Sequence, residues 1–280
     1  MRAAFLGPEG TYSHAAMLAD PRAPACDPLP LGSVHEAVLA VETGAAERAI
    51  VPIENSLEGA VGQTLDALAV GTEHVTIVGE VVHPVRHALI ARDEVELGSV
   101  RAVLSHPQAA AQCAAFVRAE LPQAAVVPVA STAEAVRLVA EGRAPAEPAA
   151  ALGTPLAARL YGGVVLREGV EDGPGNETRF VWLARDAPPP AGGGDHKTSV
   201  VWWGGGDETP GWLVRCLSEF AFRGVNLTRI ESRPRRLGLG HYMFFADLAG
   251  STADASVAEA VEALRTQAET VKVLGSYPAA

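Results

Sequence analysis

The stretch DAPPPAGGGDH occupies residues 186–196 of this 280-residue chain and separates a long part from a short one. It joins a run of prolines to a run of glycines, a composition that disfavours the interior of both helices and strands. We therefore predict a linker at 186–196, one domain over residues 1–185 and a second over residues 197–280. The length is consistent with two domains of about 150 residues each.

Residues 1–185 alternate strand-like apolar runs with helical patterns. Strands are expected in RAAFLG (2–7), AERAIVPI (46–53), VRAVLS (100–105) and TRFVWLA (178–184), and helices from about residue 12, over 33–43, from about residue 59, over 107–120 and over 131–141. This alternation predicts an α/β architecture with largely parallel sheets. In such sheets, ligands bind beyond the carboxyl ends of the strands.

Residues 197–280 follow the order βαββαβ, which predicts a ferredoxin-like domain. Strands are expected in KTSVVWWGG (197–205), GVNLTRIESRP (224–234), GHYMFFADL (240–248) and VKVLGSY (271–277), and helices over 210–223 and 256–268. In the first of these helices, apolar residues recur at helical spacing.

Composition narrows the range of partners and compartments. The net charge of -11 repels phosphate backbones, which argues against nucleic acid as a partner. The cysteines, Cys26, Cys113 and Cys216, form no CxxC pair, so neither a disulfide framework nor a metal site is indicated, and free thiols fit a reducing compartment. The strand-like start of the chain does not indicate secretion, and no apolar run is long enough to span a bilayer. We expect a cytoplasmic protein without a cofactor.

Two polar loops follow predicted strands near the N-terminus. GPEGTYSH (7–14) leaves backbone N–H groups free, with Thr11 at a helix start, which suits an anion as well as an ordinary capped turn. VPIENSLEGAV (51–61) places Asn55 and Ser56 directly behind a buried strand. Asn55 can donate and accept two hydrogen bonds each, which suits a hydroxyl or carboxylate ligand, and a turn with a capping serine is the alternative.

Two more segments place polar residues at the end or the start of a predicted strand. LSHPQAAAQC (104–113) starts a helix at Pro107 with Ser105 or His106 as its cap, and Gln112 either faces the side of Ser105 or is solvated. In NETRFVWLA (176–184), strand alternation directs Thr178 and Phe180 to one face and Arg179 to the other. Thr178 and Arg179 should therefore not converge on one atom unless a bulge intervenes.

Five segments together resemble the prephenate dehydratase family, in its bacterial monofunctional type, over essentially the whole chain: GPEGTYSHAA, VPIENSLEGAV, SHPQAAAQC, ETRF and RGVNLTRIESRP. The resemblance implies a two-lobed catalytic domain similar to type II periplasmic binding proteins, with lobes at about 1–75 with 160–185, and 76–159. It also implies a C-terminal ACT regulatory domain. The implied reaction converts prephenate to phenylpyruvate with loss of CO2 and water, in phenylalanine biosynthesis, without metal or other cofactor.

The resemblance also implies roles for individual residues. Thr178 matches the threonine central to catalysis, and Asn55, Ser105 and Gln112 match the polar residues around it. Substrate-binding positions of the cleft are matched by Thr11, Ser56, Arg179 and Phe180. We expect Thr178 to donate to the leaving oxygen while Asn55 and Gln112 polarise and orient that group.

ACT domains of this family bind phenylalanine at a subunit interface, which implies L-phenylalanine as effector and a homodimer or homotetramer. The matching positions are Gly211, Leu213, Asn226, Glu231, Ser232, Arg233 and Pro234. Trp212 stands where the family usually has a small residue, so its indole could fill or reshape the effector pocket. Arogenate dehydratase, prephenate decarboxylase and a non-catalytic sensor or solute-binding protein are the alternative functions.

Overall fold

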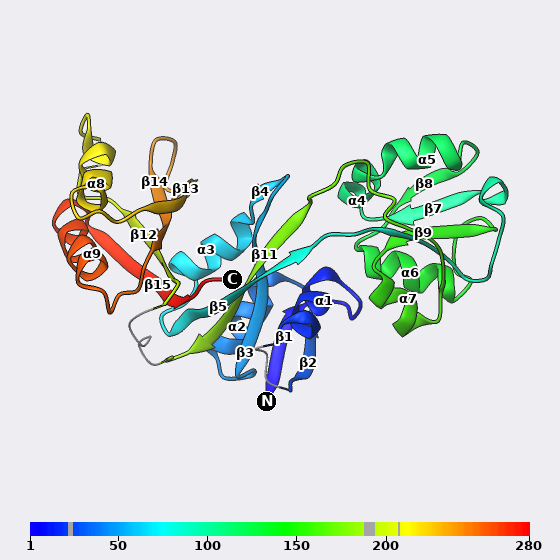
Figure 1. Ribbon diagram of the computed structural model, residues 1–280, viewed down its shortest axis with the longest axis horizontal. Helices are drawn as coiled ribbons and strands as arrows, with labels where there is room; N and C mark the ends of the chain where they lie inside the picture. Colours follow the sequence, from blue (N-terminus) through cyan, green and yellow to red (C-terminus); the bar gives the residue numbers. More distant parts are fainter. Residues whose placement is uncertain (22–24, 188–193, 207) are drawn as a thin grey trace.

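A computed structural model describes residues 1–21, 25–187, 194–206 and 208–280 (Figure 1). The centre of the predicted linker, residues 188–193, lies outside the described residues. These described residues form three sheets, two of them upstream of the linker and one downstream. In Figure 1 the C-terminal domain lies at the left, the first lobe in the centre and the second lobe at the right.

The first lobe is built on a sheet with the strand order β2-β1-β3-β11-β5, and β4 pairs with β3. Its elements are β1 (Arg2–Leu6), α1 (Tyr12–Ala19), β2 (Asp27–Leu31), α2 (Val34–Glu42), β3 (Arg48–Asn55), β4 (Gly59–Ala60), α3 (Gly62–Val70), β5 (Val75–Pro84) and β11 (Glu177–Arg185). Buried residues of α1 pack on one face of the sheet, and those of α2 and α3 pack on the other. The sheet is therefore covered on both faces.

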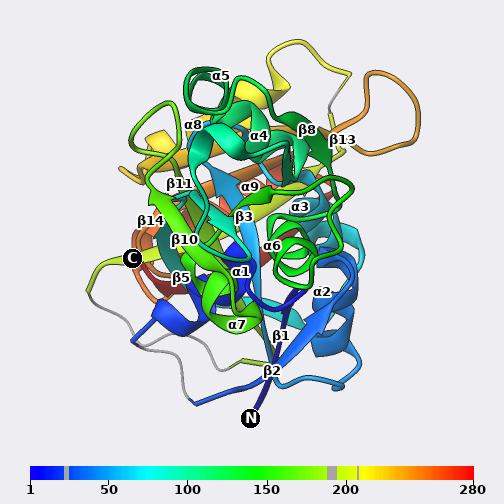
Figure 2. The same cartoon turned by 90° about the vertical axis from the view of Figure 1, so that its right-hand side faces the viewer.

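The second lobe has its own sheet, with the order β10-β6-β9-β7-β8. Its elements are β6 (Ala88–Ala91), the 3-10 turn η1 (Leu97–Ser99), β7 (Ala102–Ser105), α4 (Pro107–Gln112), α5 (Ala114–Glu120), β8 (Ala125–Pro128), α6 (Thr132–Ala140), β9 (Ala149–Gly153), α7 (Pro155–Tyr161) and β10 (Val164–Glu168). Figures 1 and 2 show α4 and α5 above this sheet and α6 and α7 below it. Two separate apolar clusters fill the two faces.

The structure corrects four sequence-based expectations for these lobes, and the fourth concerns the helix expected over 107–120. Both sheets are mixed rather than largely parallel, since β11 runs antiparallel to β3 and β5, and β6 runs antiparallel to β9 and β10. The lobe boundaries also differ, because β5 pairs in the first sheet and β10 in the second. The expected helix from about residue 59 begins at Gly62, after the short strand β4.

The expected helix over 107–120 is interrupted at Cys113. This residue has φ -118° and ψ 16°, outside the helical range, and it separates α4 from α5. The carboxylate of Asp172 accepts hydrogen bonds from the backbone N–H groups of Ala115 (2.9 Å) and Phe116 (3.2 Å). A new helix start is thus capped by a residue more than fifty positions away, which local periodicity does not reveal.

The C-terminal domain has the predicted order βαββαβ and the antiparallel strand order β13-β14-β12-β15. Its elements are β12 (His196–Trp203), α8 (Trp212–Ala221), β13 (Leu227–Pro234), β14 (Tyr242–Ala249), α9 (Ala255–Gln267) and β15 (Thr270–Pro278). The two helices cover one face of the sheet. The other face contributes Val201, Phe245 and Leu274 to the core of the first lobe, so the two domains share one apolar cluster.

Candidate active site

A cavity of about 900 Å³ lies between the two lobes. The chain passes from the first lobe to the second at residues 85–87 and returns at residues 169–176. These crossing segments are hydrogen-bonded to each other, since Val85 N–H donates to the Asn176 carbonyl at 2.8 Å. Polar residues of both lobes and both crossing segments line the cavity: Thr11, Tyr12, Ser13, Asn55, His87, His106, Gln108, Gln112, Ser131, Thr132, Glu134, Asn176 and Thr178.

Thr178 and Asn55 lie opposite each other on β11 and β3. The side-chain oxygen of Asn55 accepts from the backbone N–H groups of Leu57 and Glu58, both at 3.0 Å, which fixes the orientation of the amide. Asn55 Nδ2 therefore donates to Thr178 Oγ1, at 2.9 Å. A hydroxyl that accepts in this way keeps its own proton for another acceptor. The described residues provide no such acceptor, so the proton is available to a ligand.

A chain of amides connects this pair to the second lobe. Asn55 Nδ2 also donates to Asn176 Oδ1 at 2.7 Å, and Asn176 Nδ2 donates to Gln112 Oε1 at 3.1 Å. His87 Nε2 lies 3.1 Å from the same Gln112 oxygen. Because Gln112 engages these neighbours through its oxygen, its NH2 group is left for a ligand in the cavity.

The imidazole of His87 lies between Gln112 and the hydroxyl of Tyr12. Burial lowers the pKa of His87, although the hydrogen bond with Gln112 opposes the shift. Gln112 Oε1 accepts, so the proton lies on His87 Nε2, and Nδ1 faces the hydroxyl of Tyr12 at 2.8 Å. The Tyr12 hydroxyl also lies 2.7 Å from the Arg86 carbonyl, so its single proton is shared between two acceptors, and these contacts fix the phenol beside the cavity.

Neutral groups dominate the cavity wall. Among the lining residues that the structure describes, none is lysine or arginine. Helices α1 and α6 both begin at the cavity, where Thr11 and Ser131 cap them. The positive end of a helix dipole stabilises a nearby anion by about 0.3–1 kcal/mol. The site can thus hold an anionic ligand through neutral donors and helix termini, without burying paired charges.

Five of the eight predicted catalytic and substrate-binding residues meet in this wall: Thr11, Asn55, Gln112, Thr178 and Phe180. Ser105 does not, since it is fully buried and its hydroxyl donates to the Leu152 carbonyl at 3.2 Å. Ser56 accepts from Glu177 N–H at 3.0 Å and donates to the Gly175 carbonyl at 3.2 Å. Ser105 and Ser56 therefore support the framework around the cavity rather than line it.

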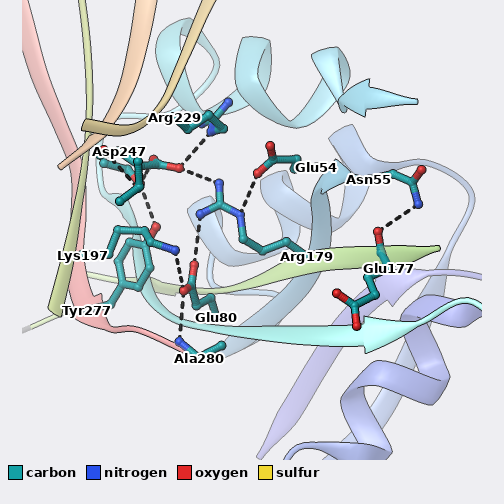
Figure 3. Close-up of polar contacts among 12 residues, drawn as sticks. Glu54, Asn55, Glu80, Glu177, Arg179, Lys197, Arg229, Asp247, Tyr277 and Ala280 are labelled. Carbon is teal, nitrogen blue, oxygen red and sulfur yellow. Dashed lines mark hydrogen bonds and ion pairs between the residues drawn. The ribbon is translucent and has the colours of Figure 1, made fainter. Parts of the chain in front are cut away.

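Arg179 points away from the cavity, as strand alternation predicted. Its Nε lies 3.2 Å from a Glu54 oxygen, its Nη1 3.0 Å from Glu80 and its Nη2 2.6 Å from Asp247. All three nitrogens face carboxylates (Figure 3). Glu54 and Glu80 belong to the first lobe, and Asp247 belongs to the C-terminal domain. The resemblance implied a substrate contact for Arg179, and this position does not provide one.

The predicted effector residues are distributed over two regions of the C-terminal domain. Gly211 and Leu213 line a cavity of about 240 Å³ next to α8. The remaining ones lie at or before β13, the edge strand of the sheet: Asn226, Glu231, Ser232, Arg233 and Pro234. Arg233 forms a two-pronged ion pair with Asp66 of α3, at 2.7 and 2.9 Å, so in this chain it bridges the domains.

Trp212 occupies the core of the C-terminal domain. It is 3% exposed, and its Nε1 donates to the Gln267 carbonyl at 2.6 Å. The indole borders the 240 Å³ cavity and packs against Phe244, with ring centroids 5.9 Å apart. The indole thus forms part of the wall of this cavity and also contacts the end of α9.

Sequence reasoning missed Tyr12, His87 and Asn176 as site residues. Two of them belong to segments that carried a signal, since Tyr12 lies in GPEGTYSH and Asn176 opens NETRF. His87 belongs to no segment with a signal, since it lies in the short crossing segment between β5 and β6. The described residues contain no group of three His, Cys, Asp or Glu side chains arranged to hold a metal ion.

These features define a two-lobed α/β protein with a neutral, donor-rich cleft between its lobes. The sequence profile of prephenate dehydratase matches residues 3–188. A prephenate dehydratase of Mycobacterium marinum is 43% identical over 285 residues, covering 99% of this chain and 88% of that one. Among the described residues, no helix has the length and apolar character needed to cross a membrane.

Solved structures agree with the profile. A prephenate dehydratase of Arthrobacter aurescens in complex with L-Phe has 41% identity and a TM-score of 0.91, covering 99% of this chain and 90% of that one. GqqA, described as a novel type of quorum quenching acylase, has 32% identity and a TM-score of 0.88, covering 100% and 98% of the two chains. The present chain belongs to the prephenate dehydratase family. The predicted activity, that of a lyase in phenylalanine biosynthesis, is confirmed.

Proposed function

We propose that the inter-lobe cleft dehydrates prephenate by means of neutral hydrogen-bond donors, with the Thr178 hydroxyl donating to the leaving oxygen. The observation that carries this proposal is the fixed bond from Asn55 Nδ2 to Thr178 Oγ1 at 2.9 Å. Asn55 occupies a lone pair of the hydroxyl and leaves its proton directed elsewhere. The free NH2 group of Gln112 is placed to bind the same oxygen or a substrate carboxylate.

In the reaction the bond from the ring to its carboxylate breaks, and its electron pair enters the ring as carbon dioxide leaves. The ring C–O bond breaks at the same time, and its electron pair leaves with the hydroxyl oxygen. That oxygen takes up one proton and departs as water, so prephenate and a proton yield phenylpyruvate, carbon dioxide and water. General-acid assistance is worth about 10²–10⁴-fold. Orientation and preorganised dipoles supply the rest.

His87 helps to orient the Gln112 side chain. As a neutral donor it holds Gln112 Oε1, and Tyr12 in turn holds its other ring nitrogen. A charged imidazolium would add a cation that the chain of amides is not arranged to balance. We therefore assign His87 and Asn176 to the orientation of Gln112 and Asn55, not to the proton transfer itself.

The proposal extends to the type of fold of the two lobes and to the role of the C-terminal domain. The two lobes, each with its own sheet and joined by two crossing segments, fit the type II periplasmic-binding-protein-like arrangement. The βαββαβ domain fits an ACT domain, with the cavity at Gly211 and Leu213 and the edge strand β13 completed by a second copy of the chain. L-phenylalanine is the effector that this domain would bind, and its slowing of turnover would be feedback on the final product. Free thiols fit a cytoplasmic location.

The experiment compares the wild-type chain with Thr178→Val, which removes the hydroxyl and keeps the shape. With prephenate, and no added metal or nucleotide, the wild type should produce phenylpyruvate, detected by its ultraviolet absorbance. Thr178→Val should lose about 10²-fold or more in kcat with an unchanged thermal transition. Near-normal turnover in this variant would remove Thr178 from its role. A product that keeps the ring hydroxyl would favour a decarboxylase, and faster turnover of arogenate would favour an arogenate dehydratase.

A further inference from the structure

Asp247, on β14 of the C-terminal domain, contacts the residue next to Thr178. It is 0% exposed, and its Oδ2 lies 2.6 Å from Arg179 Nη2 and 2.8 Å from Arg229 Nε (Figure 3). Ser199 donates to the other oxygen at 2.6 Å. Burial alone would raise the pKa of Asp247, but Arg229 and Arg179 hold it at about 2. The buried carboxylate is therefore a charged, fully engaged anchor.

Around Asp247 the junction between the domains is electrically balanced. Glu80, 2% exposed, accepts from Arg179 at 3.0 Å and from Lys197 at 2.6 Å, and its carboxylate also accepts from the backbone N–H of Ala280 at 3.0 Å. With Glu54, the junction contains three carboxylates and three cations. Buried charges are tolerated only with their partners in good geometry. Small displacements of one sheet against the other are therefore unfavourable.

The junction and the cleft share one short segment of two strands. Thr178 pairs with Asn55 and Arg179 with Glu54, after which a bulge on β3 leaves Ile53 without a partner on β11. Successive residues of a strand point to opposite faces. The Thr178–Asn55 pair therefore faces the cleft, and the Arg179–Glu54 pair directly behind it faces the C-terminal domain.

We propose that Asp247 is a positioning residue for the dehydration reaction, contributed by the C-terminal domain. It holds Arg179, and through the backbone of β11 it holds the Thr178 hydroxyl where Asn55 and the substrate require it. The inference rests on the proposed role of Thr178. Misplacement of a reacting group by about 1 Å can cost on the order of 10²-fold in rate. The C-terminal domain, which does not contact the substrate in the cleft, thereby affects kcat.

The test uses the full chain with Asp247→Asn and Arg229→Gln combined. This double variant removes one anion and one cation, so the junction stays balanced while Arg179 loses its anchor. We expect kcat to fall about tenfold or more with KM within about threefold of wild type, a split that marks lost transition-state positioning. Lys272→Met is the matched control, because Lys272 also joins the domains, donating to the Leu68 and Thr72 carbonyls at 2.7 and 2.6 Å. These hydrogen bonds go to α3 and the residues after it rather than to β11, so the substitution should leave kcat unchanged.

A folded double variant with wild-type kcat, beside an inactive Thr178→Val, would overturn the positioning role and leave the proposed function standing. An active Thr178→Val would overturn both. If circular dichroism shows that the double variant does not fold, Arg179→Lys replaces it, since lysine keeps the charge but cannot reach three carboxylates. The same loss of kcat at constant KM is expected, and unchanged kcat there would equally reject the inference.

Discussion

Asn176 Nδ2 donates to Gln112 Oε1 at 3.1 Å, and this bond joins the returning crossing segment to the last residue of α4. Through Asn176 and Asn55 the contact continues to Thr178, on the first lobe. Hydrogen bonds between neutral amide side chains therefore connect the two lobes next to the crossing segments. A rotation of one lobe against the other would change the donor geometry at Thr178, which couples lobe position to the reacting group.

Asn55→Asp is expected to abolish most of the activity. Aspartate keeps the oxygen that accepts from Leu57 and Glu58, so the turn should persist, but it cannot donate to Thr178 Oγ1. It also places a negative charge beside a dianionic substrate. We expect kcat/KM to fall by about 10³-fold, which corresponds to about 4 kcal/mol. Steady-state assays check this, with the thermal transition as control, and a loss smaller than tenfold would contradict the assigned donor role.

His87→Gln should make stability less sensitive to acid. Burial lowers the pKa of His87 in the folded state, so between that value and the ordinary value of about 6.5 the unfolded chain binds the extra proton. Stability therefore falls as the pH drops below about 6.5, and this contribution disappears in His87→Gln. Urea midpoints at about pH 7 and about pH 5 measure the difference.

Two other histidines contribute to the slope that remains in that variant. Burial also lowers the pKa values of His14 and His83. His35→Gln, at an exposed position of α2, controls for the effect of a histidine-to-glutamine substitution itself. Identical slopes for wild type and His87→Gln would mean that His87 is not held neutral in the cleft.

Gly275→Ala should loosen the contact between β15 and the first lobe. A methyl group at 275 would overlap the carbonyl oxygen of Ile77 and approach its Cβ to 2.8 Å, and backbone cannot yield as a flexible side chain would. We expect a loss of about 1–3 kcal/mol in the free energy of unfolding, from denaturant titration. Gly173→Ala is the matched control, because nothing lies within 4 Å of a Cβ there. Equal free energies of unfolding for Gly275→Ala and Gly173→Ala would show that the methyl group at 275 is accommodated without loss of stability.

L-phenylalanine should bind the C-terminal domain in equilibrium dialysis with labelled ligand at millimolar concentration or below. Val214 lines the cavity at α8 and is 66% exposed, so Val214→Asp places a carboxylate there without disturbing the core. This variant should lose uptake and keep its turnover in the absence of phenylalanine. No uptake by the wild type would discard phenylalanine as the effector. Light scattering with and without the ligand reports whether a second copy completes the site.

Trp212→Ala is expected to lower stability and also to open the effector cavity that the indole borders. The indole is buried between α8 and α9, and its removal leaves both a void and an unsatisfied Gln267 carbonyl. Replacing a buried tryptophan by alanine costs about 3–5 kcal/mol. Thermal unfolding measures this, with Val214→Ala, at an exposed position of the same helix, as control. A transition close to that of the wild type would show that the indole is not part of the core.

Local pattern was sufficient for the order of most elements and for the two opposite faces of β11. Periods of two and of about 3.6 residues belong to the backbone itself, so they can be read without partners. The same reasoning missed β2, where two prolines interrupt DPLPL, and β9 with α7, where alanine-rich segments carry little contrast. It also predicted parallel sheets, because the direction of pairing is a long-range property.

The residue types of the cleft, and the opposition of Thr178 and Arg179, were already contained in the order of amino acids along the chain. The folded molecule alone decided that Ser105 is buried, that Arg179 meets an aspartate 68 positions later, and that His87 and Asn176 join the cleft. The physical reason is that strand alternation acts between neighbours, whereas ion pairing and the packing of lobes act between segments whose proximity depends on the whole fold.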